Sequence, residues 1–159
     1  GATGVSWRRP SRGSPFRASA DPTDVAWRRA EFGGIDAFIS HSWSDDADLK
    51  WAALQGWRRA FKAQHHREPT VWIDRLCIDQ SDVASSLPLL PVYLAGCQHC
   101  LAIVGPSYLR RLWCAMELFV WVAAGKSAEA ITILPIWPPA PAPAPGAGGS
   151  APSVEESGS

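Results

Sequence analysis

The sequence lacks the features of several large protein classes. It has no run of roughly eighteen apolar residues, so we expect no segment that spans a membrane. Its formal net charge is zero, so no overall field would attract nucleic acid or an anionic membrane surface. We therefore expect neither nucleic acid nor a membrane as a partner.

Several catalytic signatures are also missing. The chain has no phosphate loop of the form GxxxxGK[ST], no GxGxxG after a strand, no GxSxG and no HExxH. These motifs carry nucleotide hydrolysis, hydride transfer, serine esterase chemistry and zinc peptidase chemistry, respectively. The sequence therefore lacks the parts for those reactions.

Cysteine is scarce, with 4 in 159 residues, and each lies inside an apolar run. A disulfide scaffold has a higher cysteine density, so we predict reduced thiols and a cytoplasmic location. Cys97 and Cys100 form a CxxC pair around His99, but a structural zinc usually needs a second such pair. We therefore expect no metal site and no cofactor.

The ends of the chain differ in composition from its middle. Residues 1–30 mix Gly, Pro and Ser with six Arg and two Asp, which predicts a flexible basic arm. Residues 138–159 are rich in Pro, Ala, Gly and Ser, which predicts a disordered tail. One folded domain is expected between them, over residues 31–137. Because the chain begins with Gly1 and not with Met, we expect it to be a fragment or a processed product.

Strand-like and helix-like segments alternate through the expected domain. Short apolar runs bounded by turn residues predict buried strands, and apolar residues at helical spacing predict helices between them. The expected strands are Ile35–Ser40, Thr70–Asp74, Cys100–Val104 and Ala130–Ile136, and the expected helices are 45–61, Leu87–Gly96 and Ser107–Ala124. This βαβαβαβ order predicts an α/β fold, with a short parallel sheet of about four strands covered on both faces.

Polar stretches follow the expected strands. In a parallel sheet the carboxyl ends of the strands share one edge, and ligands gather there. SHSWSDD, DRLCIDQSD and GPSY follow the first three strands. In the first stretch, the side chains of His41, Ser42 and Trp43 suit a ribose or a flat ring, while Ser44 or Asp45 suits a helix cap.

Asp74 closes the second expected strand and begins a polar loop. Asp79 and Asp82 add negative charge to that loop. A loop of this kind beside a ligand site gates the site or faces a partner, and otherwise it is ordinary surface.

One carboxylate interrupts an apolar helical run. Glu117 lies in RLWCAMELFVW, where no Lys or Arg is placed three or four residues away to pair with it. Burial beside Trp113 and Trp121 would disfavour its charged form, and carboxyls perturbed in this way cluster at active sites. A solvated head or a salt bridge to another element is the alternative, and the spacing leaves both interpretations open.

Three motifs in this order resemble one family. DAFISHSWSDD, VWID with its polar loop, and PSYLRRLWCAMEL are similar to the Toll/interleukin-1 receptor (TIR) domain over about residues 35–136. The family's first strand reads like DVFISH, and its third helix carries a WCxxEL element. WIDRLCIDQ is also similar to the WIDALCINQ signature of fungal heterokaryon-incompatibility (HET) domains, which are distant relatives of TIR domains.

The resemblance implies a flavodoxin-like fold. Some TIR domains cleave the nicotinamide–ribose bond of NAD, and others only assemble with partner TIR domains. In the enzymatic members the glutamate of a WxxxE element is catalytic, a pattern that falls on Trp113 and Glu117 here. The resemblance also implies that residues 41–43 line the nucleotide, and that Asp74 and the following loop gate the site and mediate self-association.

Two functions are expected as alternatives. The first is a TIR-like signalling domain that acts as an NAD nucleosidase through Glu117, gated by self-association, with NAD as substrate and not as cofactor. The second is a non-enzymatic TIR- or HET-type interaction module in signal transduction or an innate-immunity-like response. A small-molecule-binding flavodoxin-like domain without a signalling role is a third alternative.

Two departures from the family pattern favour the interaction module. The chain turns into Pro and Ala after Trp137, where the family continues with another helix and a fifth strand. The position after FIS offers His41, Ser42 and Trp43, where some active members place basic residues that meet phosphates.

Overall fold

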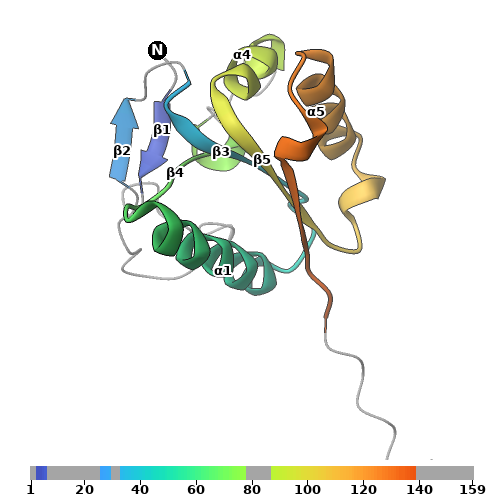
Figure 1. Ribbon diagram of the computed structural model, residues 1–159. Helices are drawn as coiled ribbons and strands as arrows, with labels where there is room; N and C mark the ends of the chain where they lie inside the picture. The colour runs from blue at the N-terminus through green and yellow to red at the C-terminus, as the bar shows by residue number, and fades with distance from the viewer. Residues whose placement is uncertain (1–2, 7–25, 30–32, 78–86, 139–159) are drawn as a thin grey trace, which may run out of the picture.

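The computed structural model describes residues 3–6, 26–29, 33–77 and 87–138 (Figure 1). Its strands are β1 (Thr3–Ser6), β2 (Ala26–Arg29), β3 (Ile35–His41), β4 (Thr70–Ile73), β5 (Cys97–Val104) and β6 (Ile131–Pro135). Its helices are α1 (Ala47–His65), α2 (Asp74–Cys77), α4 (Leu90–Ala95) and α5 (Leu112–Ala123), with short 3₁₀ turns η2 (Leu87–Leu89), η3 (Tyr108–Arg110) and η4 (Ala128–Ala130).

The strands form one sheet in the order β2-β1-β4-β3-β5-β6. β4, β3, β5 and β6 run parallel to one another. If these four strands are numbered along the chain, their order across the sheet is second, first, third and fourth. This is the strand order of a flavodoxin-like sheet, in which the order reverses between the first and third strands. The predicted α/β fold with four parallel strands is therefore confirmed.

β1 and β2 lie within residues 1–30, for which the sequence predicted a flexible arm. β1 pairs antiparallel with both β2 and β4. Without β1, β4 would be an edge strand with unpaired N–H and C=O groups, so a short antiparallel neighbour satisfies part of its backbone. The rest of the predicted arm and residues 139–159 of the predicted tail lie outside the described residues.

Helices cover both faces of the sheet, with α1 on one face and α4 and α5 on the other (Figure 1). Alternation along β3 separates two cores: Ala37 and Ile39 pack towards α1, and Phe38 packs towards α4 and α5. Phe38 stacks on Trp72 of β4 with 4.7 Å between ring centroids. None of the helices in the described ranges is long and apolar enough to cross a membrane.

The helix cap predicted at Ser44 or Asp45 lies one residue further on. Asp46 caps α1, and its Oδ1 accepts hydrogen bonds from the backbone N–H groups of Asp48 and Leu49, each at 2.8 Å. A carboxylate at this position accepts hydrogen bonds from the free amides, and it interacts favourably with the positive end of the helix dipole. Asp45 is therefore available for a different contact.

Several boundaries differ from the sequence-based expectation, such as the start of β5, which lies at Cys97 and not at Cys100. Asp74 belongs to α2 and not to the second expected strand. The helix expected over Ser107–Ala124 is divided, because Arg111 has extended backbone angles (φ −100°, ψ 112°) between η3 and α5. The last two differences lie in the segments that follow β4 and β5, where loop contacts and not periodicity decide the backbone.

Candidate functional site

Glu117 is buried beside the carboxyl end of β3. It is 1% exposed, and Ser40 donates a hydrogen bond from Oγ to its Oε2. The Tyr108 hydroxyl lies 2.6 Å from the same Oγ. Because Ser40 has one proton and gives it to Glu117, Tyr108 donates to Ser40. Alternation along β3 turns Ser40 to the same face as Phe38, which is the face that α5 covers.

The surroundings of Glu117 favour its neutral form. Burial raises the pKa of Glu117 well above its usual value; the hydrogen bond from Ser40 opposes this rise, the Asp74 carboxylate adds to it, and Trp113 opposes it. Burial also raises the pKa of Tyr108. The carboxyl is not solvated, and among the described residues it forms no ion pair.

A second group of side chains gathers around Asp74, which follows β4 and is buried. Trp43 Nε1 donates to Asp74 Oδ2 at 2.9 Å, and His41 Nδ1 lies 3.9 Å from Oδ1. Trp43 is nevertheless 44% exposed. Its indole is held by one edge and still presents ring surface, an arrangement suited to stacking on a flat ligand ring.

Ser42 takes part in other contacts. Its hydroxyl lies 2.7 Å from that of Ser107, and its carbonyl oxygen accepts a 2.7 Å hydrogen bond from the buried Lys50 Nζ. Ser42 therefore connects the end of β3 to α1 and to the turn that follows β5. No described hydrogen bond joins it to Asp74 or Glu117.

Five of the six predicted site residues fall into two groups. Glu117 and Trp113 make up one, while Asp74, Trp43 and His41 make up the other; the effect of Asp74 on the pKa of Glu117 links them. The sixth, Ser42, lies between His41 and Trp43 in the chain, but its hydrogen bonds are with Ser107 and Lys50. The predicted loop residues Asp79 and Asp82 lie outside the described residues.

Ser40 and Tyr108 were missed as partners of Glu117. The period of two along β3 was the available signal for Ser40, because it places this hydroxyl on the same face as Phe38, which α5 covers. Tyr108 belongs to the GPSY stretch, which the sequence placed at the correct sheet edge.

Asp45 stabilises the turn after β5 through hydrogen bonds. Its Oδ1 accepts hydrogen bonds from the backbone N–H and the hydroxyl of Ser107, at 2.9 and 2.8 Å. Gly105 permits this approach, because a Cβ there would lie 2.5 Å from Asp45 Oδ2. The turn therefore needs glycine for space at this position.

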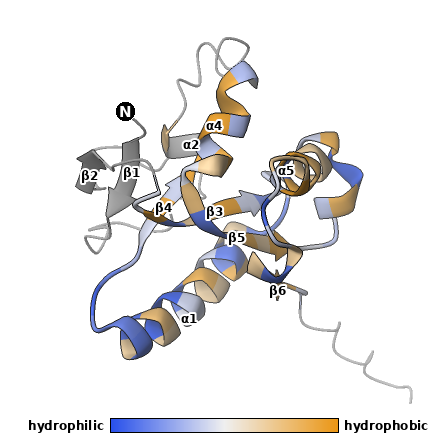
Figure 2. Ribbon diagram, turned by 45° about the horizontal axis from the view of Figure 1, so that its top comes forward, coloured by the Kyte–Doolittle hydropathy of each residue, from blue (hydrophilic) through white to orange (hydrophobic). Residues whose placement is uncertain are grey.

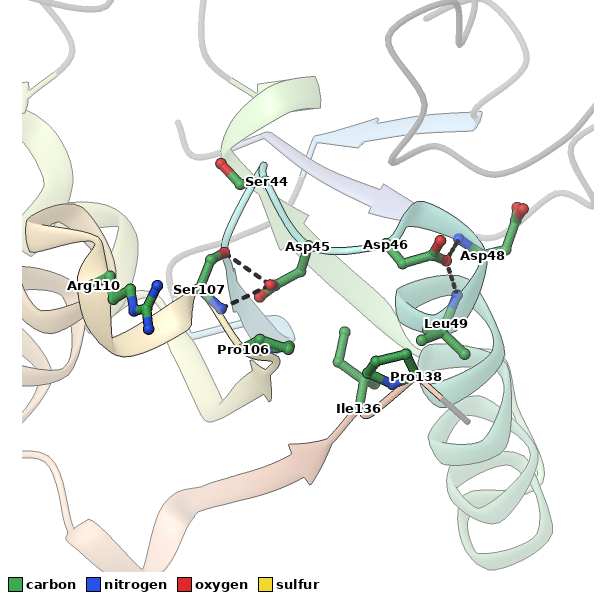
Figure 3. Close-up of a pocket in the computed structure, with 10 residues that line it drawn as sticks. All are labelled: Ser44, Asp45, Asp46, Asp48, Leu49, Pro106, Ser107, Arg110, Ile136 and Pro138. Carbon is green, nitrogen blue, oxygen red and sulfur yellow. Dashed lines mark hydrogen bonds between the residues drawn. The ribbon is translucent and has the colours of Figure 1, made fainter. Parts of the chain in front are cut away.

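A cavity of about 490 Å³ opens beside the Asp45–Ser107 contact (Figure 3). Its walls come from the segments that follow β3, β5 and β6, together with the start of α1. The lining is formed by Ser44, Asp45, Asp46, Asp48, Leu49, Pro106, Ser107, Arg110, Ile136 and Pro138. None of the six predicted site residues lines it, so this cavity is separate from the Glu117 group.

Cys97 and Cys100, the CxxC pair, lie in β5 and are buried. The Sγ of Cys97 donates to the Tyr93 carbonyl at 3.2 Å, and burial raises the pKa of the Cys100 thiol to about 12. Both therefore act as protonated core residues. Across the described ranges, no three His, Cys, Asp or Glu side chains are arranged to hold a metal ion.

An assignment of function therefore depends on the fold and on these contacts. No protein-family model matches the sequence, and no curated protein matches it.

Proposed function

We propose that the chain is a TIR-like signalling domain that cleaves NAD at the nicotinamide–ribose bond, with Glu117 as the catalytic residue and with self-association as the gate. The observation that supports this best is a buried, hydrogen-bonded carboxyl beside Asp74, at the carboxyl end of β3. Ligands of open α/β sheets bind at this edge, and carboxyls with a perturbed pKa cluster in active sites.

The chemistry needs a carboxylate near the ribose. As the bond from the anomeric carbon to the nicotinamide nitrogen breaks, positive charge develops on the sugar, and a nearby carboxylate stabilises it. Nicotinamide takes the bonding electron pair and leaves as a neutral ring, so no strong general acid is required. Attack by water on the sugar then gives ADP-ribose and releases one proton.

Substrate binding would itself ionise Glu117. The nicotinamide ring of NAD is cationic, and an opposite charge a few ångströms away favours the charged form of a carboxyl. The acid that is neutral in the free protein therefore becomes a carboxylate when the substrate is in place. Ser40 acts as a positioning residue, since its hydroxyl fixes Oε2.

Access to Glu117 requires a local rearrangement, because the side chain is buried. Trp113 is half-buried on the same helix, and its indole has a small lowering effect on the pKa of Glu117. Rotation of this indole would expose the carboxyl to a ribose, while Trp43 would stack on a ring of the substrate. A requirement for opening is consistent with an activity that depends on assembly.

The test is to incubate the concentrated protein with NAD and to follow nicotinamide release by chromatography. Glu117→Ala should abolish release while the far-ultraviolet circular dichroism is unchanged. Gln64→Ala, an exposed position on α1, is the matched control and should retain the wild-type rate. Release that persists in Glu117→Ala would overturn the assignment of the catalytic residue.

A non-enzymatic interaction module is the second candidate. It is favoured by the exposed apolar side chains of α5, because contiguous apolar surface of this kind marks interaction sites. Glu117 would then be a structural residue that holds β3 to α5 through Ser40. A folded, assembled wild type that releases no nicotinamide would make this the preferred function.

A further inference from the structure

One lysine lies inside the fold at the site edge of the sheet. Lys50 of α1 is 1% exposed, and its Nζ donates a 2.7 Å hydrogen bond to the carbonyl oxygen of Ser42. In Figure 2 hydrophilic and hydrophobic residues alternate along α1, as expected for a helix with one side on the sheet and the other in solvent. Lys50 belongs to the buried side, which it shares with Leu54 and Phe61.

Two physical effects make this position unfavourable for an ammonium group. Burial removes the charge from water, which is costly. The group also lies at the N-terminal end of α1, because the backbone N–H of Lys50 donates to the carbonyl of the N-cap Asp46 and helical side chains lean towards the N-terminus. The helix dipole disfavours a cation there, although the Asp46 carboxylate offsets part of this effect. A methionine would fill the same space without these costs, so the ammonium indicates a role beyond packing.

The hydrogen bond from Lys50 holds the backbone next to Trp43. A peptide bond is planar, so fixing the carbonyl of Ser42 also fixes the N–H of Trp43 and the direction in which the chain continues. The side chain of Ser42 is held separately, since its hydroxyl lies 2.7 Å from that of Ser107. Ser42 is therefore held by α1 through its carbonyl and by the turn after β5 through its hydroxyl.

Trp43 is the residue whose orientation this arrangement determines. Its Nε1 donates to Asp74 Oδ2 at 2.9 Å, and the side chain is 44% exposed. The contact with Asp74 fixes one edge of the indole, and the held backbone fixes the other end of the side chain. The exposed ring therefore has a defined orientation before a ligand arrives, and such preorganisation lowers the cost of binding.

We propose that Lys50 is a positioning residue for substrate binding: by holding the Ser42 carbonyl, it sets the orientation in which Trp43 presents its ring to NAD. The inference rests on the proposed NAD cleavage and adds a residue that acts through Trp43 and not on the reacting atoms. α1, which carries Lys50, and α5, which carries Glu117, lie on opposite faces of the sheet (Figure 1). Loss of the ammonium should therefore weaken substrate binding and leave the chemical step nearly unchanged.

The first test is the kinetics of nicotinamide release by Lys50→Met, which keeps an unbranched buried side chain and loses the donor. KM should rise about fivefold, because the stacking ring is no longer oriented, while kcat stays within about twofold of the wild type. Lys62→Met, the same substitution at an exposed position in the last turn of α1, is the matched control and should change neither. Circular dichroism checks that both variants remain folded.

A double-mutant cycle separates positioning from a structural role. In the Trp43→Ala background, Lys50→Met should raise KM by less than about twofold, because the ring that Lys50 orients is already absent. A purely structural role would instead lower the folded fraction, and with it kcat, in both backgrounds. If Lys50→Met does not fold, Lys50→Arg replaces it in the cycle. Arginine keeps a cation but moves the donor, so KM should rise about threefold when Trp43 is present and not when it is absent.

The second test needs no NAD. The indole N–H signal of Trp43 is identified in a nitrogen–proton correlation spectrum of the full chain by its loss in Trp43→Phe. In Lys50→Met this signal should shift, and its proton should exchange with water at least about tenfold faster, because the hydrogen bond to Asp74 opens more often. In Lys62→Met the signal should stay where it is in the wild type.

The outcomes of the two tests are distinct. An unchanged indole signal in a folded Lys50 variant, or a rise in KM that is equal with and without the Trp43 ring, would each overturn the proposal. A wild type that releases no nicotinamide would count against the proposed function instead, and the indole signal would still decide whether Lys50 positions Trp43.

Discussion

Ser40 and Glu117 are 77 positions apart in the sequence and are joined by a hydrogen bond inside the fold. The bond connects β3 to α5 and provides a neutral partner for a carboxyl that has no cation within its own helix. Burial favours the uncharged acid, and the hydrogen bond from the hydroxyl only partly opposes this effect. The proposed catalysis and the pH dependence of stability both follow from this state.

Stability should fall as pH rises above the ordinary range of glutamate titration. The pKa of Glu117 is raised in the folded state, so the folded protein holds this proton more tightly than the unfolded chain. Its stabilising effect is complete below the unfolded pKa of about 4.3 and is lost as pH rises through the folded pKa, with a slope approaching about 1.4 kcal/mol per pH unit. Glu117→Gln removes this titration.

The effect of Glu117 on the free energy of unfolding can be measured by urea unfolding of the wild type and of Glu117→Gln between about pH 5 and 8. The pKa of Glu68 is lowered to about 2 by hydrogen bonds from Arg58 and Lys62, so its contribution changes only at more acidic pH. The free energy of unfolding of the wild type should decline relative to the variant across the window. Parallel curves would show that Glu117 titrates normally.

Replacing Ser40 should destabilise the fold. Ser40→Ala leaves the buried hydroxyl of Tyr108 and the carboxyl of Glu117 without their shared partner, at a cost of about 2 kcal/mol or more. Ser44→Ala, at an exposed position four residues on, should change the free energy of unfolding by less than about 0.5 kcal/mol. Equal effects of the two substitutions in urea unfolding would contradict the role of Ser40 as the shared hydrogen-bond partner of Tyr108 and Glu117.

Two glycines should respond in opposite directions to alanine. Gly105→Ala forces a methyl group against Asp45 and disturbs its hold on Ser107, which should cost about 1–3 kcal/mol. At Gly56, in α1, a Cβ would meet only the tip of Arg59 at 4.0 Å, and alanine should stabilise the helix by up to about 1 kcal/mol. Thermal unfolding of both variants checks the pair, and a shift of the same sign in both would refute the packing argument.

Trp43 should matter for substrate binding more than for folding. Trp43→Phe keeps an aromatic face and loses the hydrogen bond to Asp74, whereas Trp43→Ala loses both. If the ring stacks on NAD, KM should rise about tenfold with alanine and less with phenylalanine. A KM unchanged in Trp43→Ala would remove this residue from the site.

The order of elements was predictable because buried strands and amphipathic helices have different periods. The helix expected over Ser107–Ala124 is interrupted at Arg111, in a turn that Asp45 fastens from another loop through Ser107, and periodicity carries no information on such contacts. β1 and β2 were not predicted, because each is only four residues long. β1 also pairs with β4, a strand that is distant in the sequence and comes beside it only in the folded chain.

The neighbours Trp113 and Trp121 left both a buried and a solvated Glu117 open, and the sequence did not identify its partner. The register of β3 against α5 decides that Ser40 and not another polar residue meets the carboxyl. Similarly, Ser42 and Trp43 are adjacent in the sequence, yet one bonds Ser107 and the other bonds Asp74. These choices depend on loop packing, which one sequence does not specify.

The most direct test of the central claim compares nicotinamide release from NAD by the concentrated wild type and by Glu117→Gln. Glutamine has nearly the same shape and can keep a hydrogen bond with Ser40, but it cannot become a carboxylate. The account predicts measurable release by the wild type and a kcat lower by at least about a hundredfold in the variant, which should remain folded by circular dichroism. Equal rates, or no release by a folded and assembled wild type, would contradict it.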